Sequence, residues 1–278
     1  MPASTTILTP THVFSRFLAT ASLRRLTLSA AFLALSVSTL APASAQAASS
    51  DATPSTVDQP HVKAARPLVW YVTRLAHADR AEDDKVRAHL ESLGYAVTMV
   101  DQSAPVADAR GAQLVVISSV VSARDMVGTA YRDIGVPLLT WEADLFDSLR
   151  FTGQRKGVDF GELDKEHYVN VVNAPSPLAG GVAAGKRWVY PRDGEMGWGR
   201  PAPGATVVAT IPGEPDHAVL FGYEKGATMD YDFIAPARRV AVFLGNRSFE
   251  HLSADGQAMF DAAVQWALAG APADARQP

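Results

Sequence analysis

Cysteine is absent from all 278 residues of this chain. The absence excludes a thiol nucleophile, a CxxC redox site and a zinc site with cysteine ligands. A fold without disulfides depends on its hydrophobic core for stability, and a chain of this length can bury a core of sufficient size.

Acidic residues are missing from residues 1–45, which contain three arginines. The apolar run 26–40 is shorter than the ~20 residues of a membrane span, and small residues follow it up to Ala45. Basic, apolar and small segments in this order are typical of a secretory signal peptide. We therefore predict export to the periplasm or the medium, with cleavage after Ala45 or Ala47. The polar tail 270–278 predicts no membrane anchor.

A surplus of basic residues is also lacking. The 25 Lys and Arg residues include the three in 1–45, whereas all 29 Asp and Glu residues come later, so the remaining chain has a net charge of −7. Because nucleic-acid-binding proteins present a basic face, we expect no nucleic-acid partner. The sequence leaves the oligomeric state open.

Strands and helices alternate between residue 67 and Asp144. Residues 46–66 are rich in Ala, Ser and Pro, which predicts a flexible lead-in. Apolar runs predict buried strands at 67–72, 95–100, 113–117 and 136–141. A capping box at 79–82 opens a helix between the first two strands, and a second helix is expected within 123–133. This order indicates a doubly wound, mostly parallel sheet.

The later part of the chain is richer in β-strand patterns. Residues 153–165 are Gly-rich and charged and predict an exposed loop. Short strands between Gly and Pro turns are expected at 168–172, 187–190, 205–210 and 218–223. A buried strand at 240–245 and a helix from about Ser253 end the pattern. We predict one α/β domain over 67–269, with a β-rich insertion at 168–232 before the last strand and helix.

Three short segments of this pattern together resemble the class I glutamine amidotransferase-like superfamily, and most nearly its ThuA-like (trehalose-utilisation-type) branch. They are Pro137–Glu142, Asn173–Val182 and Arg239–Gly245, the last followed by a helix with Ala263-Val264-Gln265-Trp266-Ala267. The second is similar to a segment of that branch that contains His-Pro, and it has Pro175 or Ser176 in place of the His. The resemblance covers residues 67–269 and implies a flavodoxin-like sheet.

The resemblance also implies where a catalytic site would lie. In catalytic members, the strand matching 138–141 ends in a strained elbow with a cysteine nucleophile, and Glu142 holds that position here. The His-x-Glu pair of those members would follow the strand 240–244, where this chain has 245–251 without a His at the strand end. The thioester chemistry of amidotransferases is therefore not expected.

Polar residues at the predicted strand ends are candidates for a binding site, because ligands of open α/β sheets bind at the carboxyl ends of the strands. The candidate ligand-binding residues are Thr73, Arg74, Ser118, Ser119, Trp141, Asp144, Asn246 and Arg247. Such residues also cap helices, and we favour Asp79 as a helix cap rather than a ligand-binding residue.

Glu142 is the candidate for acid–base catalysis. An acid beside a Trp is partly enclosed, so it should be paired or have a raised pKa. A role in a site and a structural ion pair with Arg74 or Arg247 are equally consistent with the sequence. In a catalytic role, Glu142 would work with His77 or His251.

Other site chemistries have weaker support. No metal site and no cofactor are predicted, because the histidines lack metal-ligand spacing, and no GxSxG motif is present. Glu142 and Asp144 would divide acid and base work only if the turn after the strand bends sharply. Four aromatic residues could form a sugar platform but fit a core better. They are Trp188, Tyr190, Trp198 and Tyr223.

Three functions are consistent with these observations. The first, which we prefer, is an exported non-amidotransferase that acts as a binding or accessory domain for a carbohydrate or another polar small molecule. The second is a hydrolase or isomerase that uses Glu142 as general acid or base. The third is a periplasmic protein-interaction domain that uses the insertion at 168–232.

Overall fold

A computed structural model of the protein describes residues 65–271. The predicted signal peptide, nearly all of the lead-in and most of the tail lie outside these residues. Within them, neither of the α-helices, nor any shorter helix, has the length and apolar character that crossing a membrane requires.

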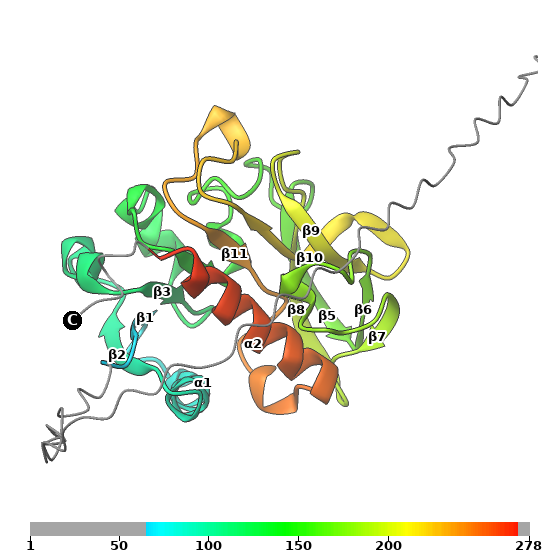
Figure 1. Cartoon of the computed structure of the whole chain (residues 1–278), viewed down its shortest axis with the longest axis horizontal. Helices are drawn as coiled ribbons and strands as arrows, with labels where there is room; N and C mark the ends of the chain where they lie inside the picture. The colour runs from blue at the N-terminus through cyan, green and yellow to red at the C-terminus, as the bar shows by residue number, and fades with distance from the viewer. Residues whose placement is uncertain (1–64, 272–278) are drawn as a thin grey trace, which may run out of the picture. The chain divides into compact units, whose positions relative to one another are not determined.

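The strands form one mixed sheet of eleven strands (Figure 1). Its main path runs β2-β1-β3-β4-β11-β10-β9-β6-β7, and β8 joins β5 to β10. The first five are β1 (Leu68–Thr73), β2 (Ala96–Asp101), β3 (Leu114–Ile117), β4 (Leu138–Thr140) and β11 (Arg239–Ala241). They pair in parallel with one another and make up the part we call the parallel half.

The other strands lie between β4 and β11 in the chain and pair only in antiparallel fashion. They are β5 (Phe160–Glu166), β6 (Tyr168–Val171), β7 (Gly185–Trp188), β8 (Gly194–Gly199), β9 (Thr206–Ile211) and β10 (Glu214–Tyr223). The α/β class is thus confirmed, but the sheet is mixed rather than mostly parallel.

Both α-helices pack on the same face of the sheet. Val86 and Leu90 of α1 (Arg80–Ser92) and Phe260 of α2 (Ala254–Ala269) share one hydrophobic cluster with inward side chains of the parallel half. The opposite face is covered by short 3₁₀ helices and loops. The 3₁₀ helices within residues 65–271 are η1 (Val106–Gly111), η2 (Ala123–Met126), η3 (Ala130–Asp133), η4 (Ala143–Leu145), η5 (Pro177–Ala179), η6 (Asp230–Asp232) and η7 (Phe249–His251).

The prediction of a helix within 123–133 is wrong, because no α-helix forms there. Two 3₁₀ turns, η2 and η3, stand there, and an extended Val127 and a Gly128 with φ of +70° separate them. A glycine in the left-handed region interrupts a right-handed helix, and its β-branched neighbours Val127 and Thr129 have a low helix propensity.

The exposed loop expected at 153–165 was also partly wrong. Its second half belongs to β5, which pairs with β8, a strand that the sequence pattern did not indicate. β5 is strongly charged and β8 contains three glycines, so neither resembles an ordinary strand. Glycine also allows the two strands to pack closely, since a Cβ on Gly161 of β5 would lie 2.9 Å from the ring of Trp198 in β8.

Helix ends follow the sequence signals in two places out of three. Ser253 caps α2 by accepting a hydrogen bond from the backbone N–H of Gly256 at 3.1 Å, and Gly94, with φ of +96°, follows the end of α1. The capping box at 79–82 is wrong, because the Asp79 side chain makes no capping hydrogen bond.

The segment Asn173–Val182, one basis of the family resemblance, is a packing element. Ser176 caps η5, and Gly180 has φ of +62°. A Cβ on Gly180 would collide with the carbonyl oxygen of Ala258 in α2, so only glycine fits this contact.

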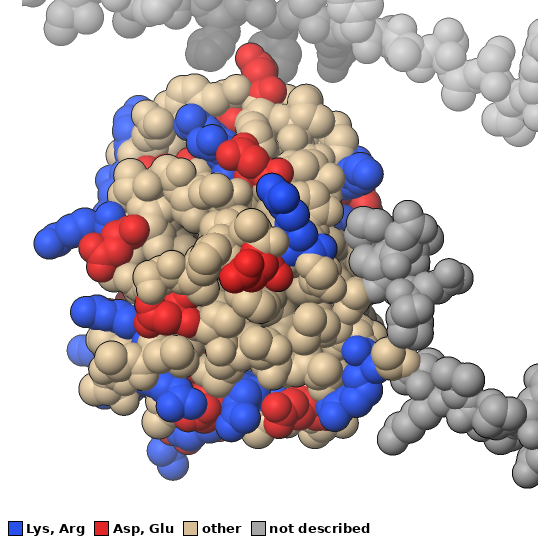
Figure 2. Space-filling model, turned by 90° about the vertical axis from the view of Figure 1, so that its left-hand side faces the viewer, with Lys and Arg blue, Asp and Glu red and all other residues tan. Residues whose placement is uncertain are grey.

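Charges of both signs are interspersed on the surface. The face in Figure 2 shows Lys and Arg side chains next to Asp and Glu side chains, with uncharged surface between them.

Candidate functional site

Glu142 lies at the carboxyl end of β4, where the chain turns at once. The hydroxyl of Thr140 donates to the carbonyl of Ile117 at 2.9 Å and accepts from the backbone N–H of Glu142 at 3.1 Å. The Glu142 carboxylate then accepts from the backbone N–H of Asp144 at 3.0 Å and so caps η4. This is the sharp bend that lets residues 142 and 144 face the same region.

Two further glutamates come from the antiparallel strands. Glu162 of β5 and Glu195 of β8 both act electrostatically on Glu142. Carboxylate oxygens of Glu142, Asp144 and Glu162 lie within 4.8 Å of one another. We call Glu142, Asp144, Glu162 and Glu195 the acidic cluster. The ammonium of Lys156 lies 2.6 Å from Asp144 and supplies an opposite charge at its edge.

Burial raises the pKa values of the three glutamates of the acidic cluster. Glu142 is only 5% exposed, and burial, followed by the charge of Glu162, raises its pKa well above the usual value. Burial and the charges of Glu195 and Asp144 raise the pKa of Glu162 to about 6, although Lys156 opposes the shift. Burial also raises the pKa of Glu195. The raised pKa values of these three glutamates favour their protonated forms relative to exposed carboxyl groups, so a proton can be exchanged here at a higher pH than at the surface.

The acidic cluster also contains the residues best suited to hold a metal ion within 65–271. Glu142, Asp144 and Glu162 could each offer one carboxylate oxygen, the ligand type that Ca²⁺ and Mg²⁺ prefer. Lys156 already neutralises part of this charge.

A polar crevice of about 340 Å³ opens beside the acidic cluster. It is lined by Asp79, Asp193, Gly194, Glu195, Asn246 and Arg247. Glu195 connects the two regions because it lines the crevice and also acts electrostatically on Glu142. The side-chain oxygen of Asn246 is buried and has no hydrogen-bond partner among residues 65–271.

The crevice contains two of the predicted ligand-binding residues, Asn246 and Arg247. The alternative in which Arg247 neutralises Glu142 is wrong, because the Arg247 guanidinium donates to Asp79 at 2.6 and 3.0 Å. This pair also explains why Asp79 does not cap α1. Arg74 is exposed and lies in the electrostatic field of Asp101.

Two other predicted ligand-binding residues, Thr73 and Ser118, fasten α1 to the sheet. Both hydroxyls donate to the buried carboxylate of Asp83, the latter at 2.8 Å, and the Tyr71 hydroxyl donates to it at 2.9 Å. Burial raises the pKa of Asp83, and these three bonds oppose the shift. Asp83 shares the helical face of Val86 and Leu90, a spacing that could have identified it as buried.

The last two predicted ligand-binding residues at strand ends are buried. Trp141 packs edge-on against Tyr71 and Phe260, with ring centroids 6.1 and 6.3 Å away, which is a core role. Ser119 is 8% exposed, and its hydroxyl has no partner in the described part of the chain.

The two candidate histidines contact residues next to them in the chain. The Nδ1 atom of His77 accepts from the backbone N–H of Asp79 at 3.1 Å, and the Nε2 atom of His251 lies 3.4 Å from Glu250. Glu142 instead interacts electrostatically with neighbouring carboxylates and with Lys156, and it accepts a hydrogen bond from the backbone. A catalytic pair of Glu142 with either histidine stays a prediction.

The aromatic residues considered for a sugar platform are mostly core residues. Tyr190, Trp198 and Tyr223 are buried, and the Tyr190 hydroxyl donates to the carbonyl of Phe243 at 2.8 Å. Trp188 alone of the four is exposed, opposite Tyr168 in the register of β6 and β7.

The architecture matches that of a solved structure, a ThuA-like protein from Bacteroides uniformis. The match has a TM-score of 0.50 at 13% sequence identity, and it covers 75% of this chain and 95% of that protein. The two proteins share a fold. At this identity the ThuA-like match extends to the arrangement of the chain and not to its chemistry.

Two further solved structures are similar at lower scores. One is described as a GMP synthase component from Thermoplasma acidophilum, with a TM-score of 0.47, 16% identity and coverage of 74% of this chain and 96% of that one. The other is a ThuA-like protein from Parabacteroides merdae, with a TM-score of 0.44, 13% identity and coverage of 75% and 91%. No protein-family model and no curated protein sequence matches this chain.

Proposed function

We propose that this protein is an exported, non-amidotransferase member of the ThuA-like branch that binds a carbohydrate or another hydroxyl-rich small molecule in the polar crevice. The observation that supports this ligand class best is the crevice lining, which consists almost entirely of hydrogen-bonding side chains. Export rests on the signal-peptide pattern of residues 1–45. The exclusion of amidotransferase chemistry rests on the missing cysteine.

The crevice chemistry suits hydroxyl groups. The carboxylates of Asp193 and Glu195 can accept hydrogen bonds from ligand hydroxyl groups, and the guanidinium of Arg247 can donate to the oxygens of those hydroxyl groups. Asn246 adds a buried amide oxygen that still needs a donor. A volume of about 340 Å³ is within the range of small-molecule sites.

Calorimetric titration of the purified protein with a panel of sugars, polyols and oligosaccharides tests the proposal. We expect at least one compound to bind, and Asn246→Ala and Glu195→Gln to weaken that binding about tenfold or more, because each removes a buried or charge-assisted hydrogen bond. Asp216→Asn, which lines a different depression, is the matched control. Absence of binding across the panel, or equal binding by both crevice variants, would refute the proposal.

A second candidate function is acid–base catalysis by the acidic cluster. The observation in its favour is that Glu142 and Glu162 have raised pKa values in unequal environments, an arrangement that can separate an acid from a base. Glu142 would supply the proton, and Glu162, with a pKa of about 6, would be ionised at neutral pH.

A screen with chromogenic glycosides and esters tests this second function. Any turnover should disappear in Glu142→Gln and fall on the acidic side of about pH 6 as Glu162 is protonated. The variants His77→Ala and His251→Ala examine the partners predicted from the sequence. Turnover that persists in Glu142→Gln would exclude the mechanism.

A further inference from the structure

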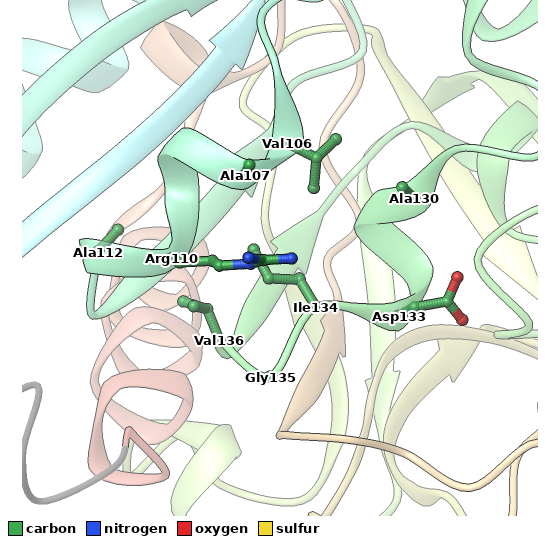
Figure 3. Close-up of a pocket in the computed structure, with 9 residues that line it drawn as sticks. All are labelled: Val106, Ala107, Arg110, Ala112, Ala130, Asp133, Ile134, Gly135 and Val136. Atoms are coloured by element: carbon green, nitrogen blue, oxygen red, sulfur yellow. The ribbon is translucent and has the colours of Figure 1, made fainter.

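A second cavity lies at the opposite edge of the parallel half. Its volume is about 480 Å³, and it opens between η1, η3 and the segment that leads into β4 (Figure 3). It is lined by Val106, Ala107, Arg110, Ala112, Ala130, Asp133, Ile134, Gly135 and Val136. Ala112 and Val136 precede β3 and β4, so this cavity lies at the amino ends of these strands, whereas Glu142 of the acidic cluster follows the carboxyl end of β4.

The lining of this cavity is mainly aliphatic. Val106, Ile134 and Val136 provide the larger side chains, and three alanines leave open space between them. Figure 3 shows these side chains arranged around the opening. Such a surface attracts a hydrocarbon group, because burial contributes about 25 cal/mol for each Å² of apolar area.

One wall of the cavity is held in place by Arg239, the first residue of β11. Its guanidinium is fully buried and donates to the carbonyls of Ile134 at 2.6 Å, Val136 at 3.0 Å and Arg132 at 3.2 Å. The wall is therefore preformed, which lowers the cost of ordering it around a ligand.

The cavity carries an uncompensated positive charge. Arg110 lines it, and Figure 3 shows its side chain reaching across toward Ile134. Within residues 65–271 the Arg110 guanidinium has no ion pair or hydrogen bond. Asp133, the one acid of the lining, is bound by both Nε and Nη2 of Arg132 at 3.1 Å. Arg239, whose pKa burial lowers to about 10, adds a second positive charge behind the wall.

We propose that this cavity binds a small apolar monocarboxylate, such as a medium-chain fatty acid or an arylalkanoic acid. The carboxylate pairs with the Arg110 guanidinium, whose planar fork matches its two oxygens. The hydrocarbon part lies against Val106, Ile134 and Val136. This site is separate from the polar crevice in place and in ligand chemistry, so neither proposal depends on the other.

Calorimetric titration with octanoate, and with octanol as its uncharged counterpart, tests the proposal. Octanoate should bind more tightly than octanol, and Arg110→Gln should weaken octanoate about tenfold while octanol binding stays the same. Ala130→Trp, which fills the cavity, should abolish binding of both. Arg124→Gln, an exposed arginine outside the lining, and Asn246→Ala, in the polar crevice, should change neither.

Three results would overturn the proposal. They are no octanoate binding to the unmodified protein, equal octanoate affinity of the unmodified protein and Arg110→Gln, and octanol binding as tight as that of octanoate. Arg110 is exposed, so its replacement should leave the fold intact, and circular dichroism of each variant verifies this. Ala107→Trp provides a second cavity-filling variant if Ala130→Trp unfolds.

Discussion

The parallel half has an amino edge, where its strands begin, and a carboxyl edge, where they end. A charged residue is buried at each edge, and the two residues differ in the hydrogen bonds that surround them. At the amino edge, Arg239 uses its donors on four backbone carbonyls, those of Arg132, Ile134, Val136 and Arg238. At the carboxyl edge, Glu142 accepts one backbone N–H and otherwise faces other carboxylates. Burial disfavours the charged form of both groups. The guanidinium nevertheless stabilises the chain around it through its hydrogen bonds, whereas a single backbone N–H offsets the burial of the Glu142 carboxyl group.

This difference separates a structural charge from a candidate functional one. Carbonyls that precede β4 would be unsatisfied without a donor, and a guanidinium with five N–H groups meets that need. No comparable group of donors surrounds Glu142 among the described residues, so the site stores an electrostatic cost. Such costs concentrate at functional sites, which supports the carboxyl edge as the place for acid–base chemistry.

The largest expected effect is at the amino edge. Replacement of Arg239 by Met should lower the free energy of unfolding by about 3 kcal/mol, because buried carbonyls lose their donors. Urea denaturation measures it. Arg239→Lys should recover only part of the loss, since an ammonium cannot reproduce the fork. Arg200→Gln, at an exposed ion pair of 3.5 Å, should cost less than about 0.5 kcal/mol; an equal loss in both variants would contradict a special role for Arg239.

A smaller effect of opposite sign is expected at the carboxyl edge. The pKa of Glu142 is higher in the folded than in the unfolded chain. Its contribution is therefore complete below about pH 4.5 and is lost as the pH rises through the folded pKa. The free energy of unfolding of Glu142→Gln, compared with that of the unmodified protein, should consequently be more favourable at pH 8 than at pH 5.

The measurement is the free energy of unfolding of both proteins between pH 4 and pH 9. The curve of Glu142→Gln should fall less steeply with rising pH, whereas Glu91→Gln, on the surface of α1, should follow the unmodified protein. Parallel curves for Glu142→Gln and the unmodified protein would show that Glu142 is not desolvated.

A local titration should respond to Lys156. Its positive charge lowers the pKa of Glu162 in opposition to burial and the neighbouring carboxylates. Lys156→Met should therefore move the pKa of Glu162 above its value of about 6. Carbon-detected NMR titration of the glutamate carboxyls reports it. Lys85→Met, at the ion pairs with Glu82 and Glu250, should have no influence, and a downward shift in Lys156→Met would contradict the assignment.

The smallest effect is expected for the ion pair across the polar crevice. The Arg247 side chain is 73% exposed, so Arg247→Gln should change the free energy of unfolding by less than about 0.5 kcal/mol. Ligand affinity should nevertheless fall if the crevice binds hydroxyl groups. A large loss of stability would show that the pair with Asp79 is structural.

Local signals predicted most of the regular elements. The apolar runs of β1 to β4 and the Ser253 cap of α2 are properties of a few neighbouring residues, and the structure has these elements within one or two residues of the expected bounds. β5 and β8 were missed because their charges and glycines are explained only by what packs against them. In β8, Gly197 faces Ala143, and Gly199 faces Thr152 and Phe146, all of which are distant in sequence.

The sequence by itself determined the α/β class, the lack of thiol chemistry and the position of Glu142 at a strand end. These follow from periodicity and composition, which depend on neighbouring residues alone. Only the tertiary structure decided which charges meet. It joined Arg247 to Asp79, gave Thr73 and Ser118 to Asp83, and placed Glu162 and Glu195 beside Glu142. Burial and charge pairing depend on residues that are distant in the chain and that only the fold brings together.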